Sequence, residues 1–79
     1  MVIGLNELRP GQSGVVRGVV GGFGMVRRLE ALGLRPGKLV TKISSQFLAG
    51  PVTVMVDGRD IAIGRGMAAK VQVEPVSQR

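Results

Sequence analysis

Residues 52–63 read Val52-Thr53-Val54-Met55-Val56-Asp57-Gly58-Arg59-Asp60-Ile61-Ala62-Ile63, which is two alternating runs around Asp57-Gly58. Asp-Gly between such runs is the strongest short-range sign of a β-hairpin with a two-residue type I′ turn. That turn sets the register of the hairpin: Val56 pairs with Arg59, Val54 with Ile61, and Val52 with Ile63. With this register the β-branched apolar residues share one face, which is the consistency expected of a correct pairing. The sequence therefore predicts an antiparallel sheet with one buried face.

Three more strands are expected outside this hairpin. The first, residues 14–20, contains four valines around Gly18, and a glycine inside a strand is typical of a bulge or a close backbone approach. The second covers residues 39–44, and the last is short, at residues 71–73. A helical turn within residues 64–70 is expected to precede this last strand.

One short helix is expected between the first two strands. Met25, Leu29 and Leu32 fall at positions i, i+4 and i+7, which is one face of a helix of about nine residues. Gly33 follows where helices commonly end in a left-handed residue, and Pro36 stops the helix from continuing. No capping side chain precedes this helix, and about nine residues are too few for a stable isolated helix, so it must pack against the sheet.

The tetrapeptide Leu-Arg-Pro-Gly occurs twice, at residues 8–11 and 34–37. Proline at the second position of a turn and glycine at the third are typical of type II, because glycine tolerates the positive φ required there. Each copy is followed by an expected strand, so we interpret the repeat as one turn used twice. Together with the hairpin, the helix end and the loop before residue 52, these patterns assign structural turns to Gly11, Gly33, Pro36, Gly37, Gly50 and Gly58.

Five short strands, with one small helix between the first two and a helical turn before the last, predict a mainly β fold. So few strands bury enough apolar surface only by curling, so we expect residues 1–79 to form one domain, a small SH3-like barrel. Its core is expected to include Val16, Leu29, Leu32, Val54 and Ile61.

Composition excludes most kinds of active site. The 79 residues include no histidine and no cysteine, which excludes histidine general bases, cysteine nucleophiles, zinc fingers and iron–sulfur clusters. We therefore expect neither an enzyme nor a bound cofactor. No apolar run approaches the roughly 20 residues needed to span a bilayer, and the N-terminus lacks the pattern of a signal peptide. The chain is expected in the cytoplasm, without insertion into a membrane.

The net charge of +6 raises the alternative of nucleic-acid binding. Small barrels bind RNA through cationic grooves with aromatic stacking platforms, but Phe23 and Phe47 are the only aromatic residues of this sequence. Its cations are scattered, with Arg27-Arg28 the only adjacent pair, so a solubilising surface is favoured and no specific nucleic acid is expected. Attraction to an acidic protein or to an anionic membrane surface stays open. Ferrous iron prefers imidazole and carboxylate ligands, and five dispersed carboxylates offer no convincing set of metal ligands.

Phe47 and Leu48 are two large apolar residues within the loop that ends in Gly50-Pro51. Exposed aromatic residues in loops often mark contacts with other molecules. The alternative is that both side chains fold back as a lid on an open end of the barrel. The sequence leaves these two interpretations open.

The sequence resembles the FeoA family, small cytosolic SH3-like barrels that accompany the bacterial ferrous iron transporter FeoB, and the similar domain at the end of DtxR-type metalloregulators. The resemblance covers nearly the whole chain, and residues 28–37 are its most distinctive stretch. It is carried by Leu5, Leu8 and Pro10-Gly11; Gly14 and Val16; Arg28-Leu29 with Leu32-Gly33-Leu34 and Pro36-Gly37; Gly50-Pro51; and Ile61-Ala62-Ile63 with Ala68, Val71 and Val73.

This resemblance implies a non-enzymatic protein-interaction module in ferrous iron uptake. The expected partner is the cytosolic region of an FeoB-type membrane transporter. The expected contact residues are Arg27, Arg28, Phe47 and Leu48. A barrel that binds a transition metal or a nucleic acid is the alternative, and self-association stays open.

Overall fold

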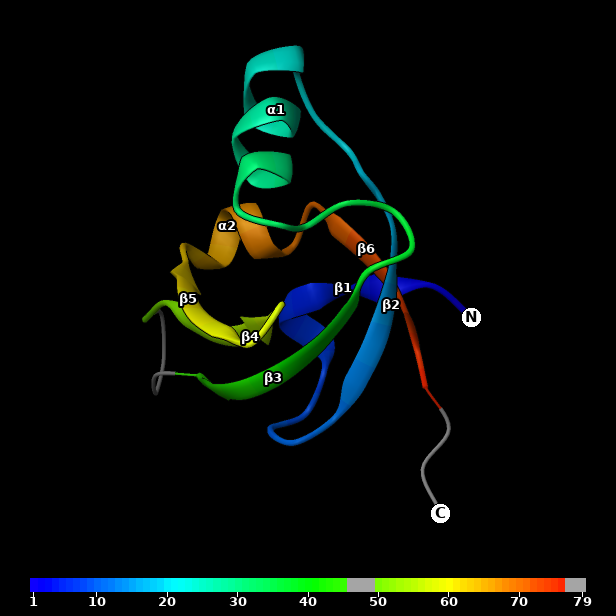
Figure 1. Ribbon diagram of the computed structural model, residues 1–79, viewed down its shortest axis with the longest axis vertical. Helices are drawn as coiled ribbons and strands as arrows, with labels where there is room; N and C mark the ends of the chain where they lie inside the picture. The colour runs from blue at the N-terminus through cyan, green and yellow to red at the C-terminus, as the bar shows by residue number, and fades with distance from the viewer. Residues whose placement is uncertain (46–49, 77–79) are drawn as a thin grey trace.

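The computed structural model describes residues 1–45 and 50–76. Within them, six antiparallel strands form one sheet in the order β1-β6-β2-β3-β4-β5. The strands are β1 (Ile3–Gly4), β2 (Ser13–Val19), β3 (Leu39–Ser45), β4 (Val52–Val56), β5 (Arg59–Ile63) and β6 (Val71–Pro75). Figure 1 shows that this sheet is strongly curved and that helix α1 stands above it.

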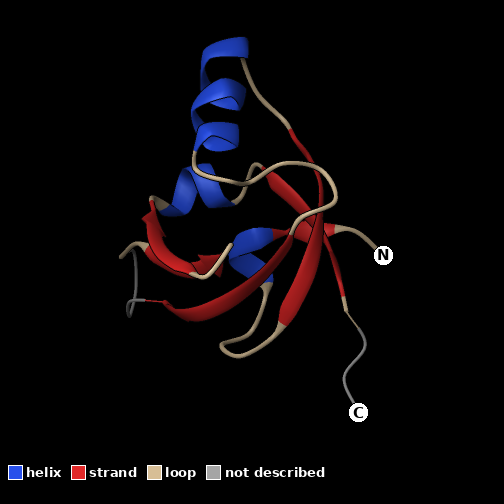
Figure 2. Cartoon of the chain, viewed as in Figure 1, coloured by secondary structure: helices blue, strands red, loops and turns tan. Residues whose placement is uncertain are grey.

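Three short helices complete the described part of the fold: η1 (Leu5–Glu7), α1 (Phe23–Ala31) and α2 (Arg65–Ala68). Figure 2 shows how few of the residues are helical beside the strands. The expected mainly β fold, with one short helix before β3 and a helical turn before the last strand, is confirmed. The sheet has one strand more than the five expected. Strand β1 is only two residues long, and two residues carry no periodicity that a sequence pattern could reveal.

The β4–β5 hairpin has the register predicted from its turn. The paired residues are Val56 and Arg59, Val54 and Ile61, and Val52 and Ile63. Asp57 and Gly58 both have positive φ, 54° and 76°, as a type I′ turn requires. The three valines of β4 are buried, whereas Met55 on the opposite face is exposed. The hairpin therefore buries the face that its sequence pattern indicates.

We expect Gly58→Val to destabilise the protein by about 1–3 kcal/mol, because a β-branched residue is strained at a φ of 76°. Gly18→Val is the matched control, since a Cβ added at Gly18 would meet no atom within 4 Å and its φ is not left-handed. Thermal unfolding of both variants measures the difference. If Gly58→Val unfolds no earlier than Gly18→Val, backbone strain at the turn is not a factor in stability.

Strand β2 is irregular where the sequence places a glycine. Its pairing with β6 shifts register between Val16 and Gly18, so that Val16 lies opposite Val73 and Gly18 opposite Gln72. Arg17 is the extra residue of this bulge. The bulge predicted from Gly18 is confirmed, and it adds to the curvature of the sheet.

Helix α1 ends in a Schellman motif. The Leu34 N–H donates to the Leu29 carbonyl oxygen at 3.1 Å, and the Gly33 N–H donates to the Glu30 carbonyl oxygen at 2.9 Å. Gly33 has a φ of 104°, which residues with a side chain rarely adopt. Leu34 is fully buried, so the chain passes from the helix directly into the core.

The two Arg-Pro-Gly segments fold into the same kind of turn. In each, the N–H of the fourth residue donates to the carbonyl oxygen of the arginine, at 2.9 Å in residues 9–12 and 3.0 Å in residues 35–38. Gly11 and Gly37 occupy the third position with φ of 85° and 93°, as a type II turn requires. Gly50 directly follows residues 46–49, which are not described, so its turn stays a prediction.

The core gathers side chains from every strand except β1, together with η1, both longer helices and the chain after α1. Its buried apolar residues are Leu5, Leu8, Val16, Leu29, Leu34, Val40, Val52, Val54, Val56, Ile63, Ala68, Val71 and Val73. Two residues expected in the core, Leu32 and Ile61, are only partly buried and pack against it. Leu32 caps the end of α1, and Ile61 lies on the edge strand β5, so each has solvent on one side.

Candidate functional site

Helix α1 presents most of its surface to solvent. Within it Leu29 is buried, and Met25 packs partly against the core. Arg27 and Arg28, the pair singled out in the sequence, are both exposed. Phe23, the first residue of the helix, is 76% exposed, and the Arg27 guanidinium lies 5.4 Å from the centre of its ring. Aromatic and arginine side chains are enriched where proteins contact partners, so the outer side of α1 is a candidate contact surface.

A cleft of about 310 Å³ lies between the C-terminal end of α1 and the β4–β5 turn. Its lining residues are Glu30, Ala31, Gly33, Arg35, Lys38, Asp57 and Arg59. Five of these seven residues are charged. Sites for apolar small molecules are lined mainly by hydrophobic side chains, so this cleft fits a charged, polar partner.

The cations of the cleft are arranged around the end of helix α1. The Arg35 Nε–H donates to the Glu30 carbonyl oxygen at 3.3 Å, and the Arg59 Nη2–H donates to the Leu32 carbonyl oxygen at 3.5 Å. Lys38 instead forms an exposed ion pair with Asp57, at 2.9 Å between Nζ and Oδ1. Cations near the last turn of a helix complement its unpaired carbonyl groups and the negative end of its dipole. The cleft therefore combines side chains of both signs at a fixed edge of α1.

Gly33 permits the close approach that forms this cleft. A Cβ added at Gly33 would lie 3.2 Å from Asp57 Oδ2 and 3.5 Å from a Val56 methyl group. The helix end therefore packs against the hairpin turn where any side chain would be crowded.

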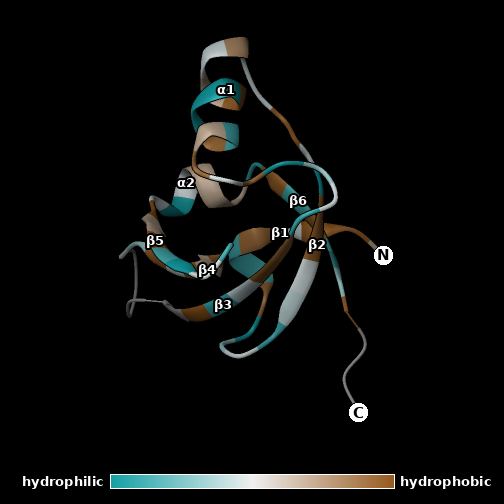
Figure 3. Cartoon of the chain, in the orientation of Figure 1, coloured by the Kyte–Doolittle hydropathy of each residue, from teal (hydrophilic) through white to brown (hydrophobic). Residues whose placement is uncertain are grey.

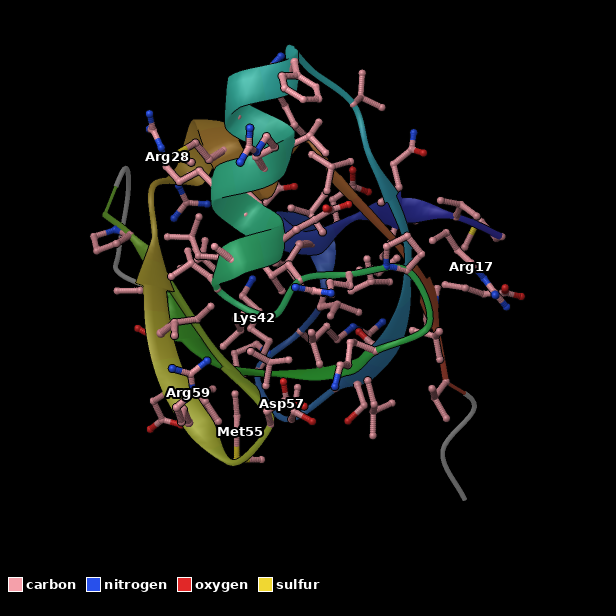
Figure 4. The ribbon with its side chains drawn as sticks, turned by 45° about the horizontal axis from the view of Figure 1, so that its top comes forward. Arg17, Arg28, Lys42, Met55, Asp57 and Arg59 are labelled. Atoms are coloured by element: carbon pink, nitrogen blue, oxygen red, sulfur yellow. The ribbon has the colours of Figure 1, made fainter. Side chains whose placement is uncertain are left out.

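Arg28 belongs to the same side of the molecule as the cleft. It lies three residues before Ala31, which lines the cleft, and Arg27 lies four residues before Ala31. Residues at these spacings are neighbours on a helix surface. Figure 4 shows Arg28 and Arg59 on one side of the view and Arg17 on the other. We call Arg27, Arg28 and the cleft residues the docking face.

Lys42 is a buried cation that the sequence reasoning missed. It lies on β3, is 4% exposed, and its Nζ donates to the carbonyl oxygens of Asn6 at 2.8 Å and Leu8 at 2.7 Å. Burial lowers the pKa of the Lys42 ammonium below its usual range, and the positive charge of Arg65 lowers this pKa further. Figure 4 labels Lys42 near the middle of the view. These two hydrogen bonds attach η1 and Leu8 to strand β3, near the centre of the sheet.

The carboxylates are spread over the described residues. Glu74 forms an exposed ion pair with Arg17, at 2.7 Å, and the hydrogen bond from Arg17 lowers the pKa of Glu74. Asp60 lies opposite Met55 on the outer face of the hairpin. Residues 1–45 and 50–76 contain no group of three or more carboxylates that could hold a metal ion. None of the helices in these two segments has the length and apolar character needed to cross a bilayer.

Two of the four predicted contact residues lie within the described part of the chain. Arg27 and Arg28 lie on the outside of α1, whereas Phe47 and Leu48 lie outside the described residues. Sequence reasoning did not select Phe23 as a contact residue. Its signal was present, because Phe23 falls off the helical stripe formed by Met25, Leu29 and Leu32 and lies four residues before Arg27, which is helical spacing.

Comparison with known proteins places this geometry among relatives. A model of the FeoA domain family matches residues 3–75. A protein of Methanocaldococcus jannaschii, provisionally named Fe(2+) transport protein A, is 36% identical over 66 residues, which span 84% of this chain and 78% of that protein.

Two solved structures share the fold over most of their length. The crystal structure of an iron uptake regulatory protein, FeoA, is 36% identical, with a TM-score of 0.90, and the match covers 96% of this chain and 100% of that one. FeoA of Stenotrophomonas maltophilia in complex with zinc is 29% identical, with a TM-score of 0.78 and coverage of 91% and 89%. That protein is described as a prokaryotic SH3 domain protein suggested to act as a ferrous iron transport activating factor. The SH3-like fold predicted from the sequence is therefore confirmed.

Proposed function

We propose, because this chain belongs to the FeoA domain family, that it is a cytoplasmic accessory protein of ferrous iron uptake. It acts without catalysis, as an interaction module that docks on the cytosolic region of an FeoB-type transporter. Relatives named for Fe(2+) transport and for activation of ferrous iron transport support this context.

The observation that carries this proposal is the docking face, where exposed arginines from two elements border one charged cleft. Arg27 and Arg28 come from α1, and Arg59 comes from β5. A few arginine and aromatic side chains usually contribute most of the free energy of a protein contact. The chain also carries a net charge of +6, so an acidic surface on the partner would approach this face readily.

The charges of the cleft favour a protein partner over a small ligand. Two of its cations, Arg35 and Arg59, already donate to helix carbonyl groups, and Lys38 is paired with Asp57. The carboxylates Glu30 and Asp57 in the same lining would repel a small anion. A protein surface instead can contact the outer edges of the same side chains and supply partners of both signs.

Phe47 and Leu48 remain part of the proposed contact. They lie outside the described residues, so the argument for them is the sequence alone. Phe47→Ser tests them separately: a docking role predicts weaker binding with an unchanged melting temperature, whereas a lid on the barrel predicts a lower melting temperature.

We expect Arg28→Ala and Arg59→Ala each to weaken binding to the transporter's cytosolic region about five-fold or more, since a truncated interface anchor costs about 1 kcal/mol or more. Co-purification and titration of the isolated cytosolic region measure the effect. Because both side chains are exposed, the melting temperature should change little.

Arg9→Ala is the matched control, because Arg9 is also an exposed arginine but lies on the turn at residues 9–12, outside the docking face. It removes the same charge and should leave binding nearly unchanged. If all three variants weaken binding equally, net charge alone drives the association. If none does, the docking face is wrong.

A further inference from the structure

The free end of helix α1 exposes apolar side chains outside the docking face. Phe23 is 76% exposed, and Val20, in the segment that leads into the helix, is 53% exposed. Figure 3 shows hydrophobic colouring at the start of α1 and along the segment before it. Neither side chain contributes to the buried core.

Cations flank these two apolar residues. The Arg27 guanidinium lies 5.4 Å from the centre of the Phe23 ring. Lys70 is exposed and is held beside Val20, whose N–H donates to the Lys70 carbonyl oxygen at 2.8 Å. The Lys70 side chain also passes near Gly21, because a Cβ added there would lie 3.9 Å from Lys70 Cδ. We call Val20, Phe23, Arg27 and Lys70 the α1 tip, which shares Arg27 with the docking face.

Both chain segments that form the α1 tip lack negative side chains. No carboxylate occurs between Glu7 and Glu30, nor between Asp60 and Glu74. The acidic residues of the neighbouring docking face, Glu30 and Asp57, lie at the opposite end of α1 from Phe23. Val20, Phe23 and Lys70 therefore have no carboxylate in their own segments, and the first one along the helix is Glu30, one turn from Arg27.

We propose that the α1 tip docks on the surface of a bilayer rich in anionic phospholipids. Phe23 and Val20 enter the boundary between headgroups and acyl chains, while Arg27 and Lys70 stay among the phosphates. Aromatic side chains and flanking cations are the combination by which amphipathic segments bind such surfaces.

The shape of the molecule favours a bilayer over a protein for this tip. Figure 1 shows the start of α1 as the part of the protein farthest from the sheet. A projecting end meets a flat, deformable surface without collision of the barrel. Nucleic acid fits less well, because Phe23 is a single ring and not a series of stacking positions.

This contact would be weak and reversible. One phenylalanine, one valine and a few cations provide less apolar area than a single acyl anchor, which alone gives marginal binding. The electrostatic part should fall as salt shortens the Debye length from about 10 Å at 0.1 M to about 3 Å at 1 M. Such binding would concentrate the protein near a membrane-bound partner without fixing it there.

Co-sedimentation with lipid vesicles tests the proposal on the whole chain. Vesicles of equal parts phosphatidylglycerol and phosphatidylcholine should bind the protein about ten-fold or more tightly than vesicles of phosphatidylcholine alone, at about 0.1 M salt. Phe23→Ser should weaken this binding about ten-fold, and Lys70→Gln about five-fold. Both changes lie at exposed positions, so circular dichroism should show the same fold as the wild type.

Two matched control variants test whether vesicle binding depends on where a side chain lies or only on its chemical type. Leu39→Ser also removes an exposed apolar side chain, 56% exposed, but on β3. Arg9→Gln also removes one positive charge, but at the turn that lies farthest from α1 in Figure 1. Both controls should bind the anionic vesicles nearly as well as the wild type.

Equal binding to both vesicle types would overturn the proposal. It would also be overturned if Phe23→Ser and Leu39→Ser, or Lys70→Gln and Arg9→Gln, weakened binding by the same factor. The vesicles contain no protein, so this result does not depend on the transporter. Conversely, Arg59→Ala should weaken transporter binding and leave vesicle binding unchanged, so the two proposals fail separately.

Discussion

Leu29→Ala is expected to lower the free energy of unfolding by about 2–5 kcal/mol, because it removes a fully buried side chain and leaves a cavity that the rigid sheet cannot fill. A domain of 79 residues is expected to have a total stability of about 4–12 kcal/mol. The substitution therefore removes a large share of it. Near the transition each kcal/mol corresponds to about 4–8 °C for a domain of this size, so the melting temperature should fall by about 8–40 °C.

Leu39→Ala is the matched control for this prediction. It makes the same chemical change at a leucine that is 56% exposed on β3, and it should alter stability by no more than about 0.5 kcal/mol. Urea unfolding followed by circular dichroism suits both variants, since the chain has no tryptophan or tyrosine for fluorescence. Similar stabilities for the two variants would show that α1 does not depend on Leu29 for its attachment.

The packing of Leu29 supports both proposed surfaces, the docking face and the α1 tip. Leu29 is the buried residue of α1, while Arg27, Arg28 and Phe23 are carried on the same nine-residue helix. A helix this short is not stable without tertiary contacts. Loss of Leu29 should therefore weaken docking and membrane binding together, by disordering the helix rather than by removing a contact. Only substitutions at exposed positions identify the contact residues themselves.

The hairpin and the turns could be predicted because their causes are local. Asp57-Gly58 specifies a turn type by backbone conformation alone, and that turn fixes the register of ten residues around it. Gly33 ends α1 for the same kind of reason, since few other residues adopt its φ of 104°. Such signals do not depend on what the rest of the chain does.

Features set by long-range contacts could not be predicted in the same way. Strand β1 exists because β6, about seventy residues later, offers it an edge to pair with. Leu32 has the spacing of a core residue, but it falls where α1 ends and the chain turns, so solvent reaches it. The cleft of the docking face joins residues from α1, the following turn and the hairpin, and no spacing along the chain reveals that they meet.

The burial of Lys42 is a further feature that depends on long-range contacts, here for a single side chain. Strand alternation places Lys42 on the same side of β3 as Val40, which is buried, so the pattern contained the signal for an inward lysine. The pattern gave no sign of the two carbonyl groups that accept hydrogen bonds from Lys42 Nζ, because these belong to residues more than thirty positions earlier. Long charged side chains are seldom fully buried, so composition gave no reason to expect this position.

Lys42→Met is expected to lower the free energy of unfolding by about 2–4 kcal/mol. Methionine has a similar length but no donor, so the carbonyl oxygens of Asn6 and Leu8 each lose a hydrogen bond, at about 1–3 kcal/mol for a buried group. Removal of the desolvated charge offsets part of this loss. The backbone of Lys42 remains bonded to Gly11 and Gln12, at 2.7 and 3.0 Å, so the strand itself should persist.

Lys38→Met is the matched control, because Lys38 forms only an exposed ion pair with Asp57. Such pairs contribute about 0–1 kcal/mol, so this variant should stay close to the wild type in urea unfolding. A Lys42→Met protein as stable as Lys38→Met, or more stable than the wild type, would show that the desolvation cost of the buried ammonium exceeds the value of its two hydrogen bonds.

The stability difference between the wild type and Lys42→Met is expected to change with pH in a defined direction. Burial and the charge of Arg65 lower the pKa of Lys42 in the folded state below its ordinary value near 10.5. Between the folded and unfolded pKa values the unfolded chain binds more protons, so the free energy of unfolding rises with pH in that window and levels off above about 10.5. The neutral amine keeps N–H donors for Asn6 and Leu8, so these two hydrogen bonds survive deprotonation. The stability difference between the wild type and Lys42→Met should therefore widen as the pH rises toward that value, and a difference that narrows would contradict the lowered pKa.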